Sequence, residues 1–245
     1  AMLTLEEGCV VKGQLSLLRT FYRLGVRMIA LTWNYENEIG APNLTPNEAG
    51  TPQFDKRNSK GLTEFGIEMI QEMERLGMIV DVSHLSDGGF WDVLHHTTQP
   101  FVASHSDAAS ECNVCRNLTD DMIRALAERG GVMGLNYCYG FLTESDKPTA
   151  LSTDTSIFMD AKKQTKKISR IEDMLRHIKH IVNIGGIEVC GLGSDFDGID
   201  NPVEFGNASG IQQLYEALVK SGFSEDDADK IFYKNVLRVY QDVLK

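Results

Sequence analysis

The sequence predicts an α/β protein built on a parallel sheet, and two observations lead to that prediction. Short apolar, β-branched runs alternate with amphipathic stretches along the whole chain, which is the pattern of successive βα units. The chain has 245 residues, and single α/β barrels commonly run to roughly 250. No linker or break in composition divides the chain, so we expect one domain over residues 1–245.

The predicted strands are short apolar segments, each followed by a helix or by a loop and a helix. They lie at residues 3–6, 27–32, 78–82, 101–104, 132–136 and 189–193. Because consecutive strands are separated by helices, they should pair in parallel and bring their carboxyl ends to one face of the sheet.

The predicted helices carry apolar residues three and four positions apart. They lie at residues 14–24, 61–76, 90–95, 120–129, 168–182, 210–220 and 224–244. Thr63 is placed to cap the second helix, and Gly77 is placed to end it. Residues 34–60 and 145–167 show no period and are expected to be long loops, which in a compact domain are usually functional.

Composition and charge exclude several classes of function. The chain has 24 basic and 35 acidic residues, a net charge of −11, whereas nucleic acids and anionic membranes select a basic face. No apolar run approaches the ~18 residues of a membrane-spanning helix. We therefore expect neither nucleic acid nor membrane as a partner. The five scattered cysteines are expected to be free thiols, and with the acidic composition they favour the cytoplasm.

Polar side chains stand at the carboxyl ends of the predicted strands. These residues are Glu6, His84, His105, Asn136 and Asp195. Because active sites of parallel barrels are built on that face, two histidines and two carboxylates there indicate a metal site.

Each of these residues also has an ordinary structural explanation. A single histidine after a strand is more often a hydrogen-bonded loop residue than a metal ligand. Two histidines after successive strands, each in a Ser-His pair, favour the interpretation as metal ligands. The segment GLGSDFDG around Asp195 is also compatible with a calcium-like turn or a capping turn. His177 and His180 lie three apart on a helix, which we attribute to an amphipathic surface helix rather than to a metal site.

Three stretches of the chain occur in the order found in a known family. They are GLTEFGIEMIQEMERLGMIVDVSHLSDGGFWDVL, PFVASHSDAASECNVCRNLTDDMIRAL and GLGSDFDGI. On these stretches the chain resembles the membrane dipeptidase (renal dipeptidase-like) family of zinc metallopeptidases. The resemblance implies a (β/α)₈ TIM-barrel-type metal-dependent hydrolase with two zinc ions in a complete site. It also implies hydrolysis of dipeptides, including those with a C-terminal D-residue.

The resemblance assigns roles to individual residues. Glu6 matches the bridging glutamate, and His84 and His105 match the two histidines of one zinc. Asp195 matches the aspartate that binds the other zinc and handles the proton of the attacking hydroxide. Arg116 matches the arginine that holds the substrate's terminal carboxylate, for which a guanidinium fork is well suited. Asn136, at a strand end, is a further candidate for substrate binding.

Two departures from the family pattern are visible. The family begins with a His-x-Asp pair on its first strand, but the first histidine here is His84 and no such pair precedes Glu6. With six predicted strands, the first two βα units of the family fold are therefore expected to be absent from this partial TIM-barrel catalytic domain. The family often has a histidine where Trp33 stands, so Asn34 or Asn37 is a candidate substitute.

These departures leave alternative hypotheses open. The chain is either a zinc dipeptidase or a truncated, non-catalytic member that binds one metal or none. A barrel hydrolase of the amidohydrolase kind, acting on a cyclic amide or ester, is a third hypothesis. A six-stranded part of a barrel exposes two unpaired strand edges, so we also expect a homo-oligomer or association through the open barrel edge.

Overall fold

The protein is an α/β structure on a parallel six-stranded sheet, which confirms the predicted fold class. The computed structural model describes residues 1–47, 52–143 and 167–245. The strands follow one another across the sheet in chain order. They are β1 (Leu3–Leu5), β2 (Val26–Ala30), β5 (Ile79–Asp81), β6 (Val102–Ala103), β7 (Val132–Asn136) and β8 (Cys190–Ser194). Within the described ranges β1 and β8 are the edge strands of this open barrel.

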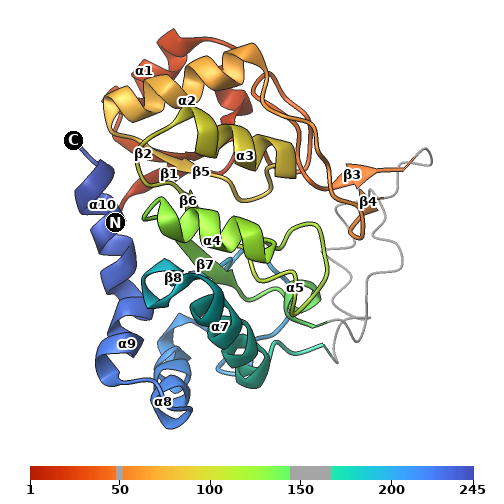
Figure 1. Cartoon of the computed structure of the whole chain (residues 1–245), viewed down its shortest axis with the longest axis vertical. Helices are drawn as coiled ribbons and strands as arrows, with labels where there is room; N and C mark the ends of the chain where they lie inside the picture. The colour runs from red at the N-terminus through yellow and green to blue at the C-terminus, as the bar shows by residue number, and fades with distance from the viewer. Residues whose placement is uncertain (48–51, 144–166) are drawn as a thin grey trace.

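Helices cover the outside of the sheet in the order in which they follow the strands (Figure 1). They are α1 (Leu15–Arg23), α2 (Glu64–Leu76), α3 (Asp87–His96), α4 (Asp120–Glu128), α7 (Ile171–Gly185) and α8 (Gln212–Lys220). The last predicted helix is α9 (Glu225–Asp229), a π-helical turn at Lys230–Lys234 and α10 (Asn235–Val243). Within the described ranges, no helix combines the length and the apolar character needed to cross a membrane.

The helix boundaries follow from capping residues in the sequence. The Thr63 hydroxyl accepts a hydrogen bond from the Gly66 amide at 2.9 Å and begins α2, as predicted. Gly77 adopts a left-handed conformation with φ 75° and ends the same helix. Thr119 caps α4 in the same way as Thr63 caps α2. The beginnings of α2 and α4 are therefore fixed by local capping chemistry.

The helix α10 lies across the amino-terminal end of the sheet and closes the core there. Val239 and Val243 form one apolar cluster with Ile79, Val102 and Val132, which belong to three neighbouring strands. Figure 1 shows this helix running beside the chain's N-terminus. The opposite end of the sheet, where the strands have their carboxyl ends, remains available for polar side chains.

Two glycines allow the strands to approach one another closely near that carboxyl end. A Cβ atom on Gly134 of β7 would lie 2.2 Å from the Ser104 carbonyl oxygen, and one on Gly193 of β8 would lie 2.1 Å from it. No side chain fits at either position, because the obstacle is backbone. The absence of these side chains places Ser104 and His105 close against β7 and β8.

Some local structure differs from the sequence-based expectation. The predicted loop over residues 34–60 contains a short antiparallel pair, β3 (Thr45–Pro46) and β4 (Pro52–Gln53). A short helix, α5 (Tyr139–Leu142), follows β7. The predicted loop at 145–167 lies outside the described residues except for its last position.

His177 is fully buried, so it lies on the inner face of the amphipathic outer helix α7 rather than on its exposed face. Its Nδ1 accepts a hydrogen bond from the Ala108 amide at 3.2 Å, and its Nε2 donates to the Leu142 carbonyl at 3.0 Å. Both contacts are to backbone, so the ring ties α7 to the segment that follows β6. Burial lowers the pKa of His177 from 6.5 to about 4.

We predict that His177 makes the free energy of unfolding depend on pH. The folded protein holds the neutral ring, whereas the unfolded chain takes up a proton below pH 6.5. Stability should therefore be fully present above pH 6.5 and fall by up to about 3 kcal/mol as the pH drops to about 4. The measurement is urea unfolding of wild-type protein and of the His177→Gln variant, which keeps a donor and an acceptor but does not titrate.

The free energy of unfolding of His177→Gln should decline less steeply than that of the wild-type protein between these pH values. The exposed His95 provides the control, because His95→Gln should leave the wild-type slope unchanged. Equal slopes for wild type and His177→Gln would contradict the prediction.

Candidate metal centre

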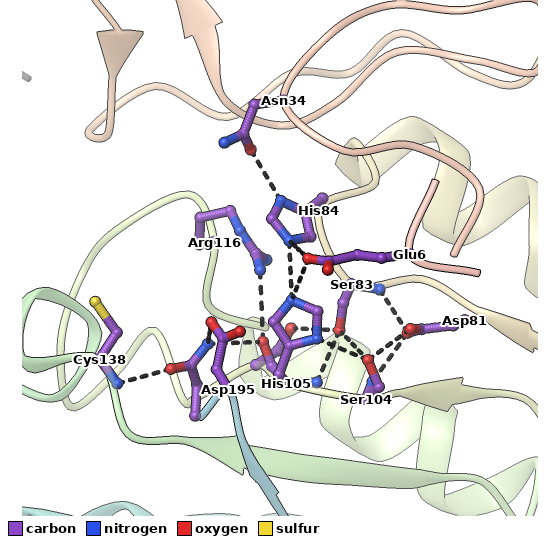
Figure 2. Close-up of polar contacts among 12 residues, drawn as sticks. Glu6, Asn34, Asp81, Ser83, His84, Ser104, His105, Arg116, Cys138 and Asp195 are labelled. Carbon is purple, nitrogen blue, oxygen red and sulfur yellow. Dashed lines mark hydrogen bonds and ion pairs between the residues drawn. The ribbon is translucent and has the colours of Figure 1, made fainter. Parts of the chain in front are cut away.

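Three of the residues singled out in the sequence meet at the carboxyl end of the sheet. Glu6 follows β1, His84 follows β5 and His105 follows β6, so three strands each deliver one side chain. One ligand atom from each lies within 4.8 Å of the others, and within the described ranges they form the one group of this kind. Figure 2 shows the two imidazole rings and the Glu6 carboxylate pointing toward a common point.

The Nε2 atoms of the two histidines lie 2.9 Å apart. The Glu6 Oε1 atom is 3.7 Å from Nε2 of His84 and 4.0 Å from Nε2 of His105. Both histidines are 7% exposed, whereas the Glu6 side chain is 62% exposed. The site is therefore buried on the histidine side and open on the carboxylate side.

The backbone at His84 is adapted to this position. His84 has φ 70°, in the left-handed region, which costs roughly 1 kcal/mol for a residue with a Cβ. The conformation follows directly after β5 and turns the ring toward His105. Residues in such conformations cluster at functional sites, where the surrounding structure holds them.

The chemistry of the three groups fits a divalent metal ion. Burial, and after it the charge of Arg116, lowers the pKa of both histidines, so both rings are neutral at neutral pH. Neutral imidazole is the form that binds metals. Two imidazoles and one carboxylate are a ligand set for zinc with a fourth position left open. The two Nε2 atoms are 2.9 Å apart, and when both carry a lone pair they repel each other unless a cation lies between them.

Arg116 lies behind the two histidines and has few partners. It is 4% exposed, its Nη2 is 3.5 Å from the His105 carbonyl oxygen, and its guanidinium lies 5.5 Å above the Phe141 ring. These are weak contacts for a buried cation, which normally has a carboxylate partner. Arg116 also lines the cavity in front of the metal ligands. It is therefore placed to bind an anion that enters this cavity.

Asp195 approaches the same cavity from β8 and is held by Asn136. The Asn136 side-chain amide donates to Asp195 Oδ2 at 3.0 Å, and the Asn136 Oδ1 accepts from the Cys138 amide at 2.7 Å. Asn136 is fully buried, whereas Asp195 lines the cavity. Asp195 has φ 66°, and it belongs to a turn with three left-handed residues that also includes Ser194 and Asp197.

The cavity itself has a volume of about 300 Å³, which is the size of a small-molecule site. The polar lining consists of Glu6, Asn34, His84, Arg116 and Asp195. The apolar lining consists of Trp33, Leu44, Phe54, Cys138, Phe141 and Ile199, with Gly140 and Gly198.

Ser104 and Asp81 were not singled out in the sequence, whereas Asn34 was named there as a candidate substitute near Trp33. Asn34 contacts His84, and Ser104 connects His105 to Asp81. Asn37, the other candidate substitute near Trp33, binds only backbone atoms of its own loop. A Ser immediately before a strand-end His was a usable signal for Ser104, whereas no signal in the sequence indicated that Asn34 contacts His84, 50 positions away.

His105 and Asp107 form the one His-x-Asp pair of the chain, and it follows the strand β6 rather than lying on the first strand of the family fold. Asp107 is fully buried, and its Oδ1 accepts a hydrogen bond from the Asn136 amide at 3.0 Å. Burial raises the pKa of Asp107 well above its usual value. Asp107 is not part of the ligand group formed by Glu6, His84 and His105.

A parallel α/β barrel with histidines and a carboxylate at its carboxyl end defines the class of metal-dependent barrel proteins. The sequence pattern of the membrane dipeptidase family, peptidase family M19, matches residues 1–245. The chain therefore belongs to the membrane dipeptidase family.

Related sequences and structures agree with this assignment. A protein of Klebsiella pneumoniae from the region 5' of pqqA is 37% identical over 229 residues, which cover 92% of this chain and 75% of that protein. An uncharacterised dipeptidase of Schizosaccharomyces pombe is 34% identical over 237 residues, covering 94% of this chain and 50% of the relative.

Solved structures show the same fold. A metallopeptidase of Rhodobacter sphaeroides, bound to a phosphinate mimic of the dipeptide L-Ala-D-Ala, is 27% identical with a TM-score of 0.82. The match covers 99% of this chain and 63% of that one. Dipeptidase AC, of family M19, is 28% identical with a TM-score of 0.82, covering 99% of this chain and 65% of that one.

We predict that the protein binds one zinc ion per chain at Glu6, His84 and His105. His84→Gln and His105→Gln should each abolish this binding, because each removes one of three ligands. His180→Gln is the matched control, since the His180 ring contacts Glu111 and Asp120 instead. The measurement is isothermal titration of metal-free protein with zinc, followed by a thermal shift.

Zinc at 100 times its dissociation constant should stabilise the wild-type protein by about 2.7 kcal/mol and should not stabilise the two ligand variants. A wild-type chain that binds no zinc would contradict the prediction. Equal loss of binding in His180→Gln would contradict the assignment of the ligands.

Proposed function

We propose that this protein is a zinc-dependent dipeptidase. The observation that carries the proposal is that Glu6 and His84 of the metal-binding group and the buried, weakly partnered Arg116 line the same cavity of about 300 Å³. Hydrolysis of a short peptide needs both features, one at the scissile bond and one at the terminal carboxylate. The family membership and the dipeptidases among the relatives support the proposal.

Each residue of the site has a role in this proposal. Glu6, His84 and His105 would hold a zinc ion, which when bound polarises a peptide carbonyl and lowers the pKa of a water molecule. Asp195 accepts the proton of the attacking water and passes it to the leaving amine. Asn136 holds the Asp195 carboxylate through the 3.0 Å hydrogen bond, so we propose it as a support for Asp195.

Arg116 sets the length of the substrate. Its guanidinium binds the terminal carboxylate in a cavity that is covered by apolar side chains, which leaves room for two residues rather than a long peptide. We further propose that dipeptides with a C-terminal D-residue are accepted. The Rhodobacter metallopeptidase with its bound mimic of L-Ala-D-Ala supports this proposal.

A non-catalytic role is the alternative. The chain spans 50% of the Schizosaccharomyces relative and 63% and 65% of the two solved structures. Within the described ranges one group of three metal ligands is present, whereas the family resemblance implies two zinc ions in a complete site. In this alternative, residues 1–245 bind one metal and a dipeptide but do not hydrolyse it.

We predict that Arg116→Lys raises KM for L-Ala-L-Ala about 100-fold, because a buried, hydrogen-bonded charge pair contributes about 3 kcal/mol. The value of kcat should change much less, since the clamp binds the ground state and the transition state alike. The measurement is steady-state hydrolysis of L-Ala-L-Ala and L-Ala-D-Ala with zinc present. The exposed Arg124, paired with Asp121, provides the control variant Arg124→Lys.

L-Ala-L-Ala amide lacks the carboxylate and should be an equally poor substrate for wild type and Arg116→Lys. Hydrolysis of a cyclic amide in preference to dipeptides would favour an amidohydrolase of another kind. Zinc and dipeptide binding with no hydrolysis would support the non-catalytic alternative.

We also propose that residues 1–245 act as one catalytic domain that associates through the open edge of the barrel. Strand β1 is an edge strand, and its Leu3 side chain is 55% exposed. Unpaired edge strands with apolar side chains are templates for association.

We predict that the wild-type chain is larger than 27.3 kDa in solution, as measured by light scattering after size-exclusion chromatography. Leu3→Lys should shift it toward the monomer. Leu24→Lys is the control, because Leu24 is 68% exposed but lies at the end of α1 and not on a strand. A strictly monomeric wild-type chain would contradict this proposal.

A further inference from the structure

The ring nitrogen that does not face the metal position has a partner in both histidines. The Nδ1 atom of His84 lies 2.8 Å from Asn34 Oδ1, and the Nδ1 atom of His105 lies 2.7 Å from Ser104 Oγ. The two partners come from different parts of the chain (Figure 2). Asn34 follows β2 and lines the cavity, whereas Ser104 follows β6.

The direction of the hydrogen bond at His105 follows from Asp81. The Ser104 hydroxyl lies 2.5 Å from Asp81 Oδ2, and Asp81 Oδ1 accepts from the Ser83 and Ser104 amides at 3.0 and 2.9 Å. A carboxylate can only accept, so the single hydroxyl proton of Ser104 points to Asp81. Ser104 Oγ must then accept from Nδ1–H of His105, and this leaves Nε2 without a proton.

The direction at His84 follows from Asn34 itself. A side-chain amide oxygen can only accept, so His84 donates through Nδ1–H and its Nε2 also carries a lone pair. The Trp33 ring lies 6.1 Å from the His84 ring, centroid to centroid, on the same loop as Asn34. The His84 ring therefore has its tautomer set by Asn34 and one side covered by Trp33.

We propose that Asn34, and Ser104 together with Asp81, are positioning residues that hold His84 and His105 in the Nδ1–H tautomer with both Nε2 lone pairs directed at one metal ion. This proposal rests on the metal centre described under the proposed function. Partners of this kind fix ring orientation and raise ligand basicity, and their loss typically weakens metal binding by about 10–100-fold.

The hydrogen-bond partners of the two histidines differ in charge. Asp81 is 2% exposed and acts on His105 through the Ser104 hydroxyl, whereas Asn34 acts on His84 as a neutral amide. Removal of either acceptor should weaken zinc binding. Replacement of the residue by another hydrogen-bond acceptor should restore zinc binding. If the residue acted only through packing, the presence of an acceptor would make no difference.

The first experiment measures the zinc dissociation constant by competition with a chromophoric chelator, without substrate. Asn34→Leu and Ser104→Ala should each weaken binding by about 10–100-fold. Asn34→Asp and Ser104→Thr keep an acceptor oxygen and should bind zinc as tightly as wild type or more tightly. Asn37→Ala is the matched control, because Asn37 lies on the same loop and binds only backbone atoms.

Wild-type affinity in Asn34→Leu and Ser104→Ala would overturn the proposal. An equal loss in Asn34→Leu and Asn37→Ala would also overturn it, because distortion of the loop would then explain the effect.

The second experiment determines the ring tautomers of the metal-free protein from ¹⁵N NMR of labelled histidine, assigned with His84→Gln and His105→Gln. Wild-type His84 and His105 should both carry their proton on Nδ1. In Asn34→Leu the His84 proton should move to Nε2, while His105 keeps its tautomer. Nε2–H on either ring of the wild-type protein would overturn the proposal. Because neither zinc nor hydrolysis is needed, this result is independent of the proposed function.

Discussion

The 2.9 Å approach of the two Nε2 atoms of His84 and His105 is the interaction on which the site depends. Such an approach is unfavourable when both Nε2 atoms carry a lone pair, and it is held by the parallel pairing of the neighbouring strands β5 and β6. Gly134 and Gly193 permit the close backbone contact at Ser104 that places His105. The fold therefore imposes an arrangement that becomes favourable when a cation lies between the rings.

Other groups around the two histidines are also held in arrangements that are unfavourable in the protein alone. His84 and Asp195 have left-handed backbones, and Arg116 is buried with only weak contacts. Each feature costs free energy in the protein alone. A cation would offset the cost at the histidines, and an anion would offset the cost at the guanidinium. Unsatisfied groups of opposite charge in one cavity of about 300 Å³ are what a zwitterionic small substrate and a metal would satisfy together.

The sequence predicted the sheet and the meeting of Glu6, His84 and His105 at its carboxyl end, because both depend on local patterns. The strand at residues 132–136 and the cap at Thr63 were predicted correctly, since period and capping chemistry are local. The contact of Asn34 with His84 could not be predicted, because it joins residues 50 positions apart within an aperiodic loop. The burial of His177 could not be predicted, because a helical pattern does not show that a loop covers the helix at that point.

The central claim is that one metal ion lies between His84, His105 and Glu6. The most direct test is the anomalous diffraction of crystals grown with zinc, measured on both sides of the zinc absorption edge. The account predicts a single strong peak within bonding distance of both Nε2 atoms and of the Glu6 carboxylate. No peak there, or a peak at His180 or another surface position, would contradict it.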